Sequence, residues 1–498
     1  MSLSLYDSHS QTVRGFEPLV PGKVGIYLCG PTVQSEPHVG HLRSALVYDQ
    51  LRRWLSAKGL QVTLVRNVTD IDDKVLANAV DRGQDWWALA YQMELEFNAA
   101  YRALAITPPT YEPRATASIP EMLALIERLI AAGYAYQAED GSADVYFAAS
   151  KWATYGELTN QKINDMASSE DGAGEDSSDG SGVGSGVTRG KRDARDFTLW
   201  KAAKPGEPAS ATWQTRFGAG RPGWHIECSA MSTKYLGSQF DIHGGGLDLR
   251  FPHHENELAQ SRAAGDKFAN FWLHNGLVNV AGNKMSKSLG NSIYAADLLG
   301  QGSPLVIRFW LGSAHYRSVL DYSPAVIGEA QAALERVTGF LKRATQVAGA
   351  DASIDAIAQN DLNKLAALYG NLPAAFVAAM DDDLSIPSAL AAVYEAVRSG
   401  NTAIDAGDSA AVAANAVAVR SMLAVLGIDP LAPEWNEAGA DSGEHAALDS
   451  LIQTLIAERN SARANKDFAR ADAIRDQLTA AGIVLRDGSD TTHWSVNG

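Results

Sequence analysis

Two histidines near the N-terminus have the type and spacing of a polyphosphate site. His38 and His41 are three positions apart and face the same way if a helix begins there. The first turn of a helix offers unpaired N–H groups and positive potential to phosphate oxygens, and Gly40 lets a ligand approach the backbone closely. A pair of surface histidines without a role explains the pattern equally well.

Two lysines later in the chain have the same spacing. Lys284 and Lys287 lie in a segment with two hydroxyl side chains, and Gly290 follows it. Lysine is a compact point charge that suits phosphoryl oxygens, so a mobile loop of this kind could close over a polyphosphate. An ordinary basic surface loop is the alternative.

A third group of residues has the donor types of a metal site. Cys29 and Cys228 are the two cysteines of the chain. His253 and Glu257 follow Pro252, which suits the first turn of a helix, and are then i and i+4 on one face. Two thiolates, one imidazole and one carboxylate form a plausible zinc set. The four are not spaced as a compact zinc motif, so two buried inert thiols are the alternative.

A parallel α/β sheet would bring these residues together. Residues 24–29 and 62–68 have the pattern of strands, and the periodic apolar residues between them predict a helix that ends at Gly59. Strand, helix and strand at this spacing indicate a parallel sheet, whose ligands bind at the carboxyl ends of its strands. Cys29 and Thr69 lie at those ends.

Beyond this unit the chain alternates between helical patterns and linkers. Helical patterns cover residues 86–135 and the Ala-rich stretch after residue 325. The run Asp381-Asp382-Asp383 predicts a solvated turn before a helix rather than a metal site. We further expect an acidic Gly/Ser-rich linker at 167–190, a helix at 388–398, a linker at 432–443, a helical segment at 446–481 and a strand at 483–485. The basic cluster at 191–195 indicates a solvated loop, with contact to RNA as the alternative.

Composition excludes several classes of protein. The 498 residues suffice for roughly three domains. The net charge of −16 argues against a generic nucleic-acid coat protein, and RNA binding would need a local basic patch. No apolar run is expected to reach the about 18 residues of a membrane span, the N-terminus lacks a signal peptide, and two cysteines make no disulfide framework. We therefore expect a soluble cytoplasmic protein.

The two basic motifs together resemble the HIGH and KMSKS signatures of class I aminoacyl-tRNA synthetases. The second signature is matched in full, and the first has Val39 in place of isoleucine. Within that class the chain resembles the cysteinyl-tRNA synthetases from about residue 5 to the C-terminus. The runs that carry this resemblance are residues 28–33, 67–74, 223–229, 244–246 and 251–257.

The resemblance implies a role for each candidate residue. In that family one zinc ion per chain binds the thiolate of the substrate cysteine, and its ligands correspond to Cys29, Cys228, His253 and Glu257. The implied catalytic residues are His38, His41, Lys284 and Lys287. The implied contacts to ATP, which binds with Mg²⁺, are His38, Gly40, His41, Gly244, Gly245, Asp248 and Lys287. The implied cysteine pocket is formed by Cys29, Thr69 and Trp224, although plain core packing also explains Trp224. A zinc–thiolate bond separates cysteine from serine well, so no editing activity is expected.

The resemblance also implies the fold. It predicts an α/β protein with a Rossmann-like class I catalytic domain that carries an insertion, then a helical bundle and a small C-terminal α+β anticodon-binding domain. The expected parts are the catalytic halves 1–120 and 213–285, the insertion 121–212, the KMSKS-bearing stem-contact region 286–330, the helical bundle 331–440 and the anticodon-recognition domain 441–498.

The implied substrates are tRNA(Cys), L-cysteine and ATP, and we expect a monomer without membrane contact. Basic side chains in the last helical region, with Trp494 near the chain end, would contact tRNA, although a salt-bridged surface helix explains them as well. These basic residues are Arg459, Arg463, Lys466, Arg470 and Arg475.

Two other functions fit part of the sequence. The cysteine ligase of mycothiol biosynthesis shares the zinc and ATP sites, but it transfers cysteine to an amino sugar and lacks the C-terminal tRNA-binding region. A non-catalytic synthetase-like protein would have lost a signature motif, and both are intact here. The chain departs from the family pattern at Gln34 and Ser35, which replace a common Tyr-Asp pair, and in its acidic Gly/Ser insert.

Overall fold

The computed structural model divides the chain into two compact units, Met1–Ala432 and Pro433–Gly498. It describes residues 2–160, 190–285, 290–354, 361–465, 467–481, 483–487 and 492–496. The expected acidic linker at 167–190 therefore lies outside the described residues, except for Gly190.

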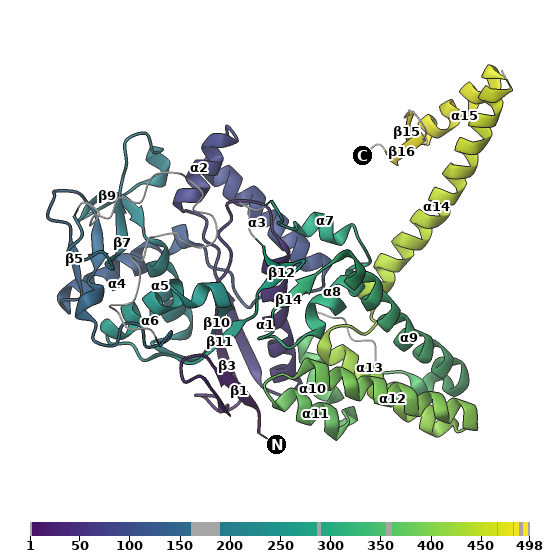
Figure 1. Cartoon of the computed structure of the whole chain (residues 1–498), viewed down its shortest axis with the longest axis horizontal. Coiled ribbons are helices and arrows are strands. Elements are labelled where there is room, and N and C mark those ends of the chain that lie inside the picture. Colours follow the sequence, from purple (N-terminus) through teal and green to yellow (C-terminus); the bar gives the residue numbers. More distant parts are fainter. Residues whose placement is uncertain are drawn as a thin grey trace. The chain divides into compact units, whose positions relative to one another are not determined.

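A four-stranded parallel sheet lies at the centre of the first unit (Figure 1). In the order β11-β10-β3-β4, its strands are β11 (Phe268–Asn275), β10 (Gln239–Gly246), β3 (Lys23–Leu28) and β4 (Gln61–Arg66). This confirms the parallel α/β sheet and both strands expected from the sequence. The strand order reverses between β3 and β10, which is where open α/β sheets bind their ligands.

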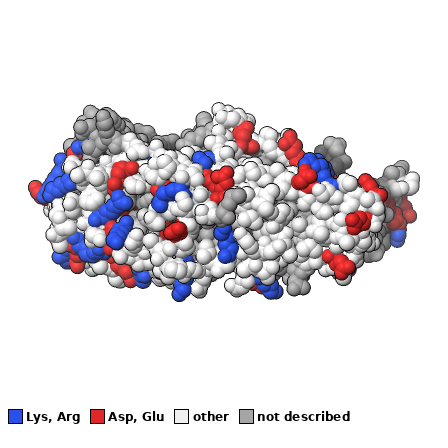
Figure 2. Space-filling model, turned by 90° about the horizontal axis from the view of Figure 1, so that it is seen from below, with Lys and Arg blue, Asp and Glu red and all other residues white. Residues whose placement is uncertain are grey.

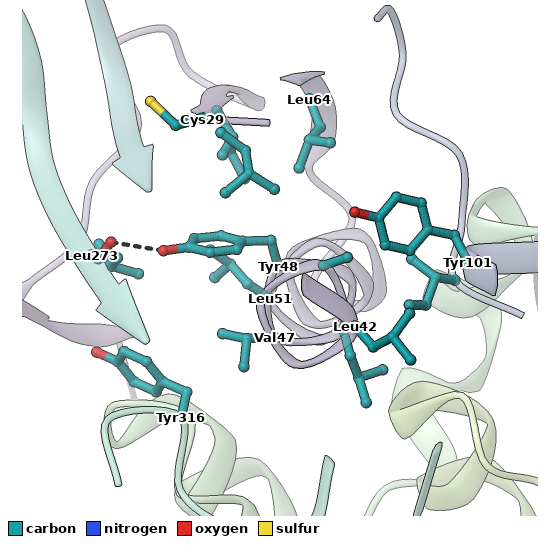
Figure 3. Close-up of a cluster of buried hydrophobic side chains, with 14 of the residues drawn as sticks. Cys29, Leu42, Val47, Tyr48, Leu51, Leu64, Tyr101, Leu273 and Tyr316 are labelled. Atoms are coloured by element: carbon teal, nitrogen blue, oxygen red, sulfur yellow. Dashed lines mark hydrogen bonds between the residues drawn. The ribbon is translucent and has the colours of Figure 1, made fainter. Parts of the chain in front are cut away.

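Helix α1 (Val39–Ala57) connects β3 to β4 as expected. Its periodic apolar residues, among them Leu42 and Leu51, are fully buried in the hydrophobic core (Figure 3). The helix ends before Gly59, whose φ of +81° is left-handed and favours glycine. This helix therefore fixes its first turn, with His38 and His41, next to the carboxyl end of β3.

Further helices and a hairpin belong to the first unit, and two of these helices and the hairpin contact the central sheet. Within residues 86–135, where a helical stretch was expected, the structure has two helices and the start of a strand. The helices are α2 (Asp73–Asp81), α3 (Trp86–Ala103), α4 (Ile119–Ala131), α5 (Trp224–Leu236) and α6 (His253–Ala263), and the hairpin is β1 (Ser4–Asp7) with β2 (Thr12–Gly15).

A five-stranded antiparallel sheet packs beside α4 and α5 (Figure 1). Its order is β5-β6-β7-β9-β8, so it extends past residue 212, where the insertion was expected to end. The strands are β5 (Ala135–Gln137), β6 (Val145–Phe147), β7 (Phe197–Ala202), β8 (Trp213–Thr215) and β9 (Gly218–Pro222).

A small sheet leads from the catalytic core to a bundle of helices. The sheet contains β12 (Val278–Val280), β13 (Asn283–Lys284) and β14 (Leu320–Tyr322), with α7 (Ala295–Leu299) and α8 (Pro304–Ser313) in the connection. The bundle contains α9 (Pro324–Ala348), α10 (Leu365–Leu368), α11 (Ala374–Asp381), α12 (Ile386–Ala406) and α13 (Ser409–Leu426). Helix α12 confirms the expected helix at 388–398 and extends it at both ends.

The aspartate run before α12 is not the solvated turn that was expected. Asp381 and Asp383 are each 3% exposed, and Asp382 alone of the three is exposed. Asp381 accepts hydrogen bonds from Lys58 Nζ at 2.7 Å and from Trp54 Nε1 at 3.2 Å. Two of the three carboxylates are therefore internal groups that join the bundle to the rest of the first unit.

One helix, α13, is long and apolar enough for a membrane span, although Asn415 and Arg420 interrupt it and no uninterrupted apolar run reaches that length. By length and composition α13 could cross a membrane, with 18 residues and a hydropathy of 1.6. Yet 56% of it is buried, it packs against α9 and α12, and its Arg420 forms a buried ion pair with Asp429. Buried core helices of bundles can have the same length and composition, so α13 is only weak evidence for a membrane span.

The second unit consists of two helices and a hairpin. Helix α14 (Pro433–Ala464) occupies residues 433–443, so the linker expected there is wrong. Together with α15 (Phe468–Ala480) it confirms the helical segment expected at 446–481, with a short break between the two helices. Asp467 caps α15 by accepting from Arg470 N, which explains the break. The hairpin is β15 (Ile483–Asp487) with β16 (Thr492–Val496).

Charged side chains of both signs are scattered over a largely uncharged face in Figure 2. In the second unit Arg470 pairs with Glu458, and Arg475 lies near Asp472. Lys466 lies outside the described residues. These ion pairs agree with a salt-bridged surface helix, and contact of the same arginines with tRNA stays a prediction.

Buried charges join α1 and α8 to the end of α13. Arg53 and Arg308 donate hydrogen bonds to the last carbonyls of α13, at residues 424–426, where the helix dipole is negative. Arg308 also forms a fully buried ion pair with Asp49. Burial alone would raise the pKa of Asp49, but Arg308 and Arg53 hold it below its usual range. The bundle is thus tied to the helix that carries His38 and His41.

Replacement of Asp49 should destabilise the protein in a pH-dependent way. In Asp49→Asn, Arg308 stays buried without its counter-charge, so the free energy of unfolding should fall by about 3–5 kcal/mol near neutral pH. The folded pKa lies below the unfolded value of about 3.9, so this stabilisation is present above that pH and is lost as pH falls further. Denaturant unfolding across this range measures it, with the exposed Asp81→Asn as the control. A deficit that persists undiminished in acid would contradict the assignment.

Candidate active site

A cavity of about 260 Å³ opens at the carboxyl ends of β3 and β10, where the strand order reverses. Gln34 and Ser35, which depart from the family pattern, also line it. Thr69, Gly244 and Gly245 do not, whereas Gly246 does. The predicted site residues that line the cavity are Cys29, His38, Gly40, His41, Trp224 and Asp248.

The two histidines of the first motif cap helix α1. His38 Nδ1 accepts a hydrogen bond from Gly40 N at 3.2 Å, and His41 Nδ1 accepts from His38 N at 3.1 Å. Their rings stack with centroids 3.7 Å apart. Because each Nδ1 accepts a hydrogen bond, the neutral ring carries its proton on Nε2. Both side chains are thus oriented as donors at a helix start that lines the cavity.

The second motif begins on the small sheet. Lys284 belongs to β13, where it pairs with Asn279 of β12, and the next residue, Met285, lines the cavity. Lys287 lies outside the described residues. The structure therefore brings the start of this motif to the same cavity as the histidines, and the role of Lys287 stays a prediction.

The four predicted metal donors converge beside the cavity. One donor atom from each of Cys29, Cys228, His253 and Glu257 lies within 4.8 Å of the others, and all four residues are buried. Cys29 Sγ lies 3.5 Å from Cys228 Sγ and 3.2 Å from Glu257 Oε1, and His253 Nε2 lies 3.1 Å from the same oxygen. The end of β3, α5 and α6 supply them. Two sulfurs, an imidazole and a carboxylate fit a zinc-type ion.

A second donor set overlaps the first. Cys29, His243, His254 and Glu257 also lie within 4.8 Å of one another. His243 Nε2, however, contacts Glu257 Oε2 at 2.8 Å, which is the oxygen that Cys29 does not contact. His254 Nε2 is 4.0 Å from Glu257, and its Nδ1 lies 2.8 Å from His274. The set that includes Cys228 has two sulfurs instead of one and therefore suits zinc better.

The pKa values within the donor cluster show strong mutual interaction. Burial, with Cys228 and Glu257 nearby, raises the pKa of Cys29. Burial would also raise the pKa of Cys228, but Cys29 and His253 bring it down to about 6. Burial would lower the pKa of His253, but Glu257 and Cys228 raise it to about 10. Burial would raise the pKa of Glu257, but His243 and His253 hold it well below its usual range.

Neighbouring side chains fix the orientation of the donors. His253 Nδ1 lies 3.0 Å from His225 Nδ1, which leaves Nε2 toward Glu257. The Trp224 ring stacks on His253 with centroids 4.0 Å apart, so this residue both packs on the cluster and lines the cavity. Thr69 Oγ1 donates to Glu227 Oε2 at 2.6 Å and is buried.

Tyr48, which was not predicted from the sequence, packs beneath the strand that carries Gly244 and Gly245. Its hydroxyl accepts from Gly245 N at 2.7 Å and donates to Leu273 O at 2.7 Å (Figure 3). A Cβ on Gly244 would lie 2.2 Å from the Tyr48 ring, and one on Gly245 would lie 2.7 Å from His254. Packing beneath the strand therefore explains both glycines, and their contact with ATP stays a prediction. No sequence pattern distinguishes this tyrosine from an ordinary core residue of α1.

Comparison with known proteins assigns the family. Residues 15–332 match the family described as tRNA synthetases class I (C) catalytic domain, residues 375–431 match the DALR domain, and residues 445–494 match the cysteinyl-tRNA ligase anticodon binding domain. The chain is 58% identical to the cysteine–tRNA ligase of Clavibacter sepedonicus over 100% of both chains. The chain belongs to the cysteine–tRNA ligase family. It is also 54% identical to the cysteine–tRNA ligase of Leifsonia xyli subsp. xyli, again over 100% of both chains.

Solved structures of other class I synthetases share the fold of this ligase. Mycobacterium tuberculosis methionyl-tRNA synthetase in complex with methionyl-adenylate aligns with a TM-score of 0.54 and 14% identity, over 82% of this chain and 92% of that one. A leucyl-tRNA synthetase complex from Agrobacterium radiobacter aligns with a TM-score of 0.57 and 13% identity, over 83% and 85%. The expected class I fold is thereby confirmed.

The contact between Tyr48 and the glycine strand gives a testable consequence. Gly244→Ala should lower the free energy of unfolding by about 1–3 kcal/mol, because the new methyl group overlaps the Tyr48 ring. Gly328→Ala is the matched control, since no atom lies within 4 Å of its Cβ on the exposed side of α9. That control should be neutral or gain up to about 1 kcal/mol. Equal stabilities of the two variants in denaturant unfolding would contradict the contact.

Proposed function

We propose that this cysteine–tRNA ligase selects cysteine through a zinc ion held by Cys29, Cys228, His253 and Glu257. The observation that carries the proposal is the position of Cys29, which belongs to the donor cluster and lines the cavity. A ligand in that cavity can therefore reach the metal. When bound, zinc supplies a Lewis acid that favours a thiolate strongly over a neutral hydroxyl. That difference supports selection of cysteine against serine without editing.

The residues of the chain would then organise two transfers. In the first, the cysteine carboxylate attacks the α-phosphorus of ATP, which is bound with Mg²⁺, and pyrophosphate leaves. His38 and His41 would hold phosphate oxygens through Nε2 at the start of α1, and Lys284 with Lys287 would stabilise the charge that develops on them. Trp224, on the cavity wall, would bound the pocket of the amino acid. In the second transfer, the 2′-OH of the terminal ribose of tRNA(Cys) attacks the carbonyl carbon, and AMP leaves.

The C-terminal region of the chain supports tRNA as the acceptor. The match to an anticodon-binding family covers residues 445–494. The resemblance implies that the mycothiol ligase lacks this region.

Asp248 and Gly246 lie on the cavity wall, where they would face the adenosine of ATP. The monomeric state and the cytoplasmic location remain predictions from the sequence.

Cysteine charging by the purified protein tests the proposal. Transfer of cysteine to tRNA(Cys), with the amino-sugar precursor of mycothiol as the parallel acceptor, should proceed with tRNA only. Serine should be activated about 10⁴-fold less efficiently than cysteine in the exchange of pyrophosphate into ATP. Transfer to the sugar without charging of tRNA would overturn the acceptor, and efficient activation of serine would overturn selection by the thiolate.

Removal of one sulfur donor tests the zinc site itself. Cys228→Ser should lose more than about 100-fold in zinc affinity, because even the partners of metal ligands contribute 10- to 100-fold. Its preference for cysteine over serine should fall in parallel. Zinc per chain, by atomic emission, and pyrophosphate exchange with both amino acids measure the two effects.

A buried neighbour on the same helix provides the control for this variant. Ser232 lies on α5, one turn after Cys228, and its hydroxyl donates to Ser229 O at 3.2 Å. Ser232→Ala should keep both zinc and selectivity. Full zinc content in Cys228→Ser, or equal loss in both variants, would count against Cys228 as a ligand.

A further inference from the structure

The loop between α8 and β14 forms the outer support of the cavity wall. Tyr316 O accepts from Gly276 N at 2.8 Å, and Leu277 O accepts from Leu320 N at 2.9 Å. A Cβ on Gly276 would lie 2.2 Å from Ser318 O, so the two backbones are in close contact. Gly276 and Leu277 line the cavity. Any shift of this loop therefore moves the wall of the cavity.

The same loop determines the position of the strand that carries Lys284. It leads into β14, which pairs with β12, and β12 in turn pairs with β13. The turn between β12 and β13 is also held by β14, because Ala281 N donates to Tyr322 O at 3.1 Å and Gly282 N donates to Asp321 Oδ1 at 2.9 Å. Lys284 thus rests on β14 through β12 and the turn.

One carboxylate from the bundle holds this loop. Asp383, between α11 and α12, accepts from Tyr316 OH at 2.6 Å through Oδ1 and from Arg317 Nε at 2.8 Å through Oδ2. Oδ1 also accepts from Tyr6 N at 2.8 Å, and Asp383 N donates to Ser4 O at 3.0 Å. The carboxylate is buried and has a hydrogen-bond partner on each oxygen.

The backbone around Asp383 is strained. Asp383 and Leu384 have φ values of +50° and +51°, a left-handed region that costs residues with a Cβ roughly 1–2 kcal/mol each. Such conformations persist where the surroundings fix them and often serve a site. Here the contacts of the Asp383 carboxylate provide that fixation.

Helix α1 holds the loop from the other side. The buried guanidinium of Arg43, two residues after His41, donates to the carbonyl of Leu311, to Ala314 O at 3.4 Å and to His315 O at 3.0 Å. The loop is therefore fixed between the helix of the first motif and the bundle. Asp383 provides the second attachment of the loop, at residues close to β14.

We propose that Asp383 is a positioning residue for the formation of the adenylate, acting through Tyr316 and Arg317 on the strand that carries Lys284. This inference rests on the proposed role of Lys284 at the phosphates of ATP. The group does not touch substrate. It aligns the cavity wall and Lys284 with the histidines of α1, and this alignment matters most when charge develops on the transferred phosphoryl group.

The test measures pyrophosphate exchange by five variants of the full-length enzyme. Asp383→Asn keeps the shape of the side chain but loses the charge that holds Arg317, so kcat should fall about 10- to 100-fold, as expected for a misplaced catalytic group. The KM for cysteine should not change, because the donor cluster lies elsewhere. Arg317→Met, a milder change at a half-exposed residue, should lower kcat in the same direction. The double variant should be no worse than Asp383→Asn. The exposed neighbour Asp382→Asn should match the parent.

Three results would overturn the inference, and a fourth would instead overturn the proposed role of Lys284. A parental kcat in Asp383→Asn, with only the unfolding midpoint lowered, would make the residue purely structural. Additive losses in the double variant would show that Asp383 and Arg317 do not act together. If Asp383→Asn fails to fold, the kcat of Arg317→Met becomes the test of the inference. An unchanged kcat in Arg317→Met would then overturn it. Lys284→Met, which should lose more than about 100-fold in exchange, distinguishes the two ideas, since full exchange in it would refute the role of Lys284 itself.

Discussion

The burial of four strongly polar donors at the end of the central sheet constrains the rest of the structure. Cys228, His253 and Glu257 are at most 1% exposed, and Cys29 is 9% exposed. Polar groups removed from water are costly unless each finds a partner, and here they partner one another. Three separate elements, β3, α5 and α6, must meet within a few ångströms for this to occur. The parallel sheet fixes the first, and the packing of α5 on α6 fixes the other two.

The surroundings of this cluster are arranged to keep it in place. His225 and Trp224 orient His253 from one side, and His243 holds Glu257 from the other. The glycines of β10 admit Tyr48 and His254 beneath the strand, so α1 can approach closely. As a result the first turn of α1, which carries His38 and His41, lines the same cavity as Cys29. One packing arrangement thus sets both the amino-acid side and the nucleotide side of the site.

Local patterns in the sequence predicted those elements that depend only on residues close together along the chain. The apolar run of β3, the periodicity of α1 and the glycine after it determine that unit by themselves. The set of metal donors came from family resemblance, because the spacing of the residues could not choose His253 over His243 or His254. Composition gave a wrong prediction at residues 432–443, where small residues suggested a linker and the structure has a helix. Asp383 was wrongly predicted to lie in a solvated turn because its partner Tyr6 is 377 positions away, and such contacts leave no local pattern.

X-ray absorption at the zinc edge of the purified protein tests whether the donor cluster holds zinc through two sulfurs. We expect about one zinc per chain, with two sulfur neighbours at about 2.3 Å and two lighter neighbours at about 2.0–2.2 Å. A single sulfur with imidazole neighbours would instead indicate the overlapping set of Cys29, His243, His254 and Glu257. That result, or a protein that takes up no zinc, would contradict the account.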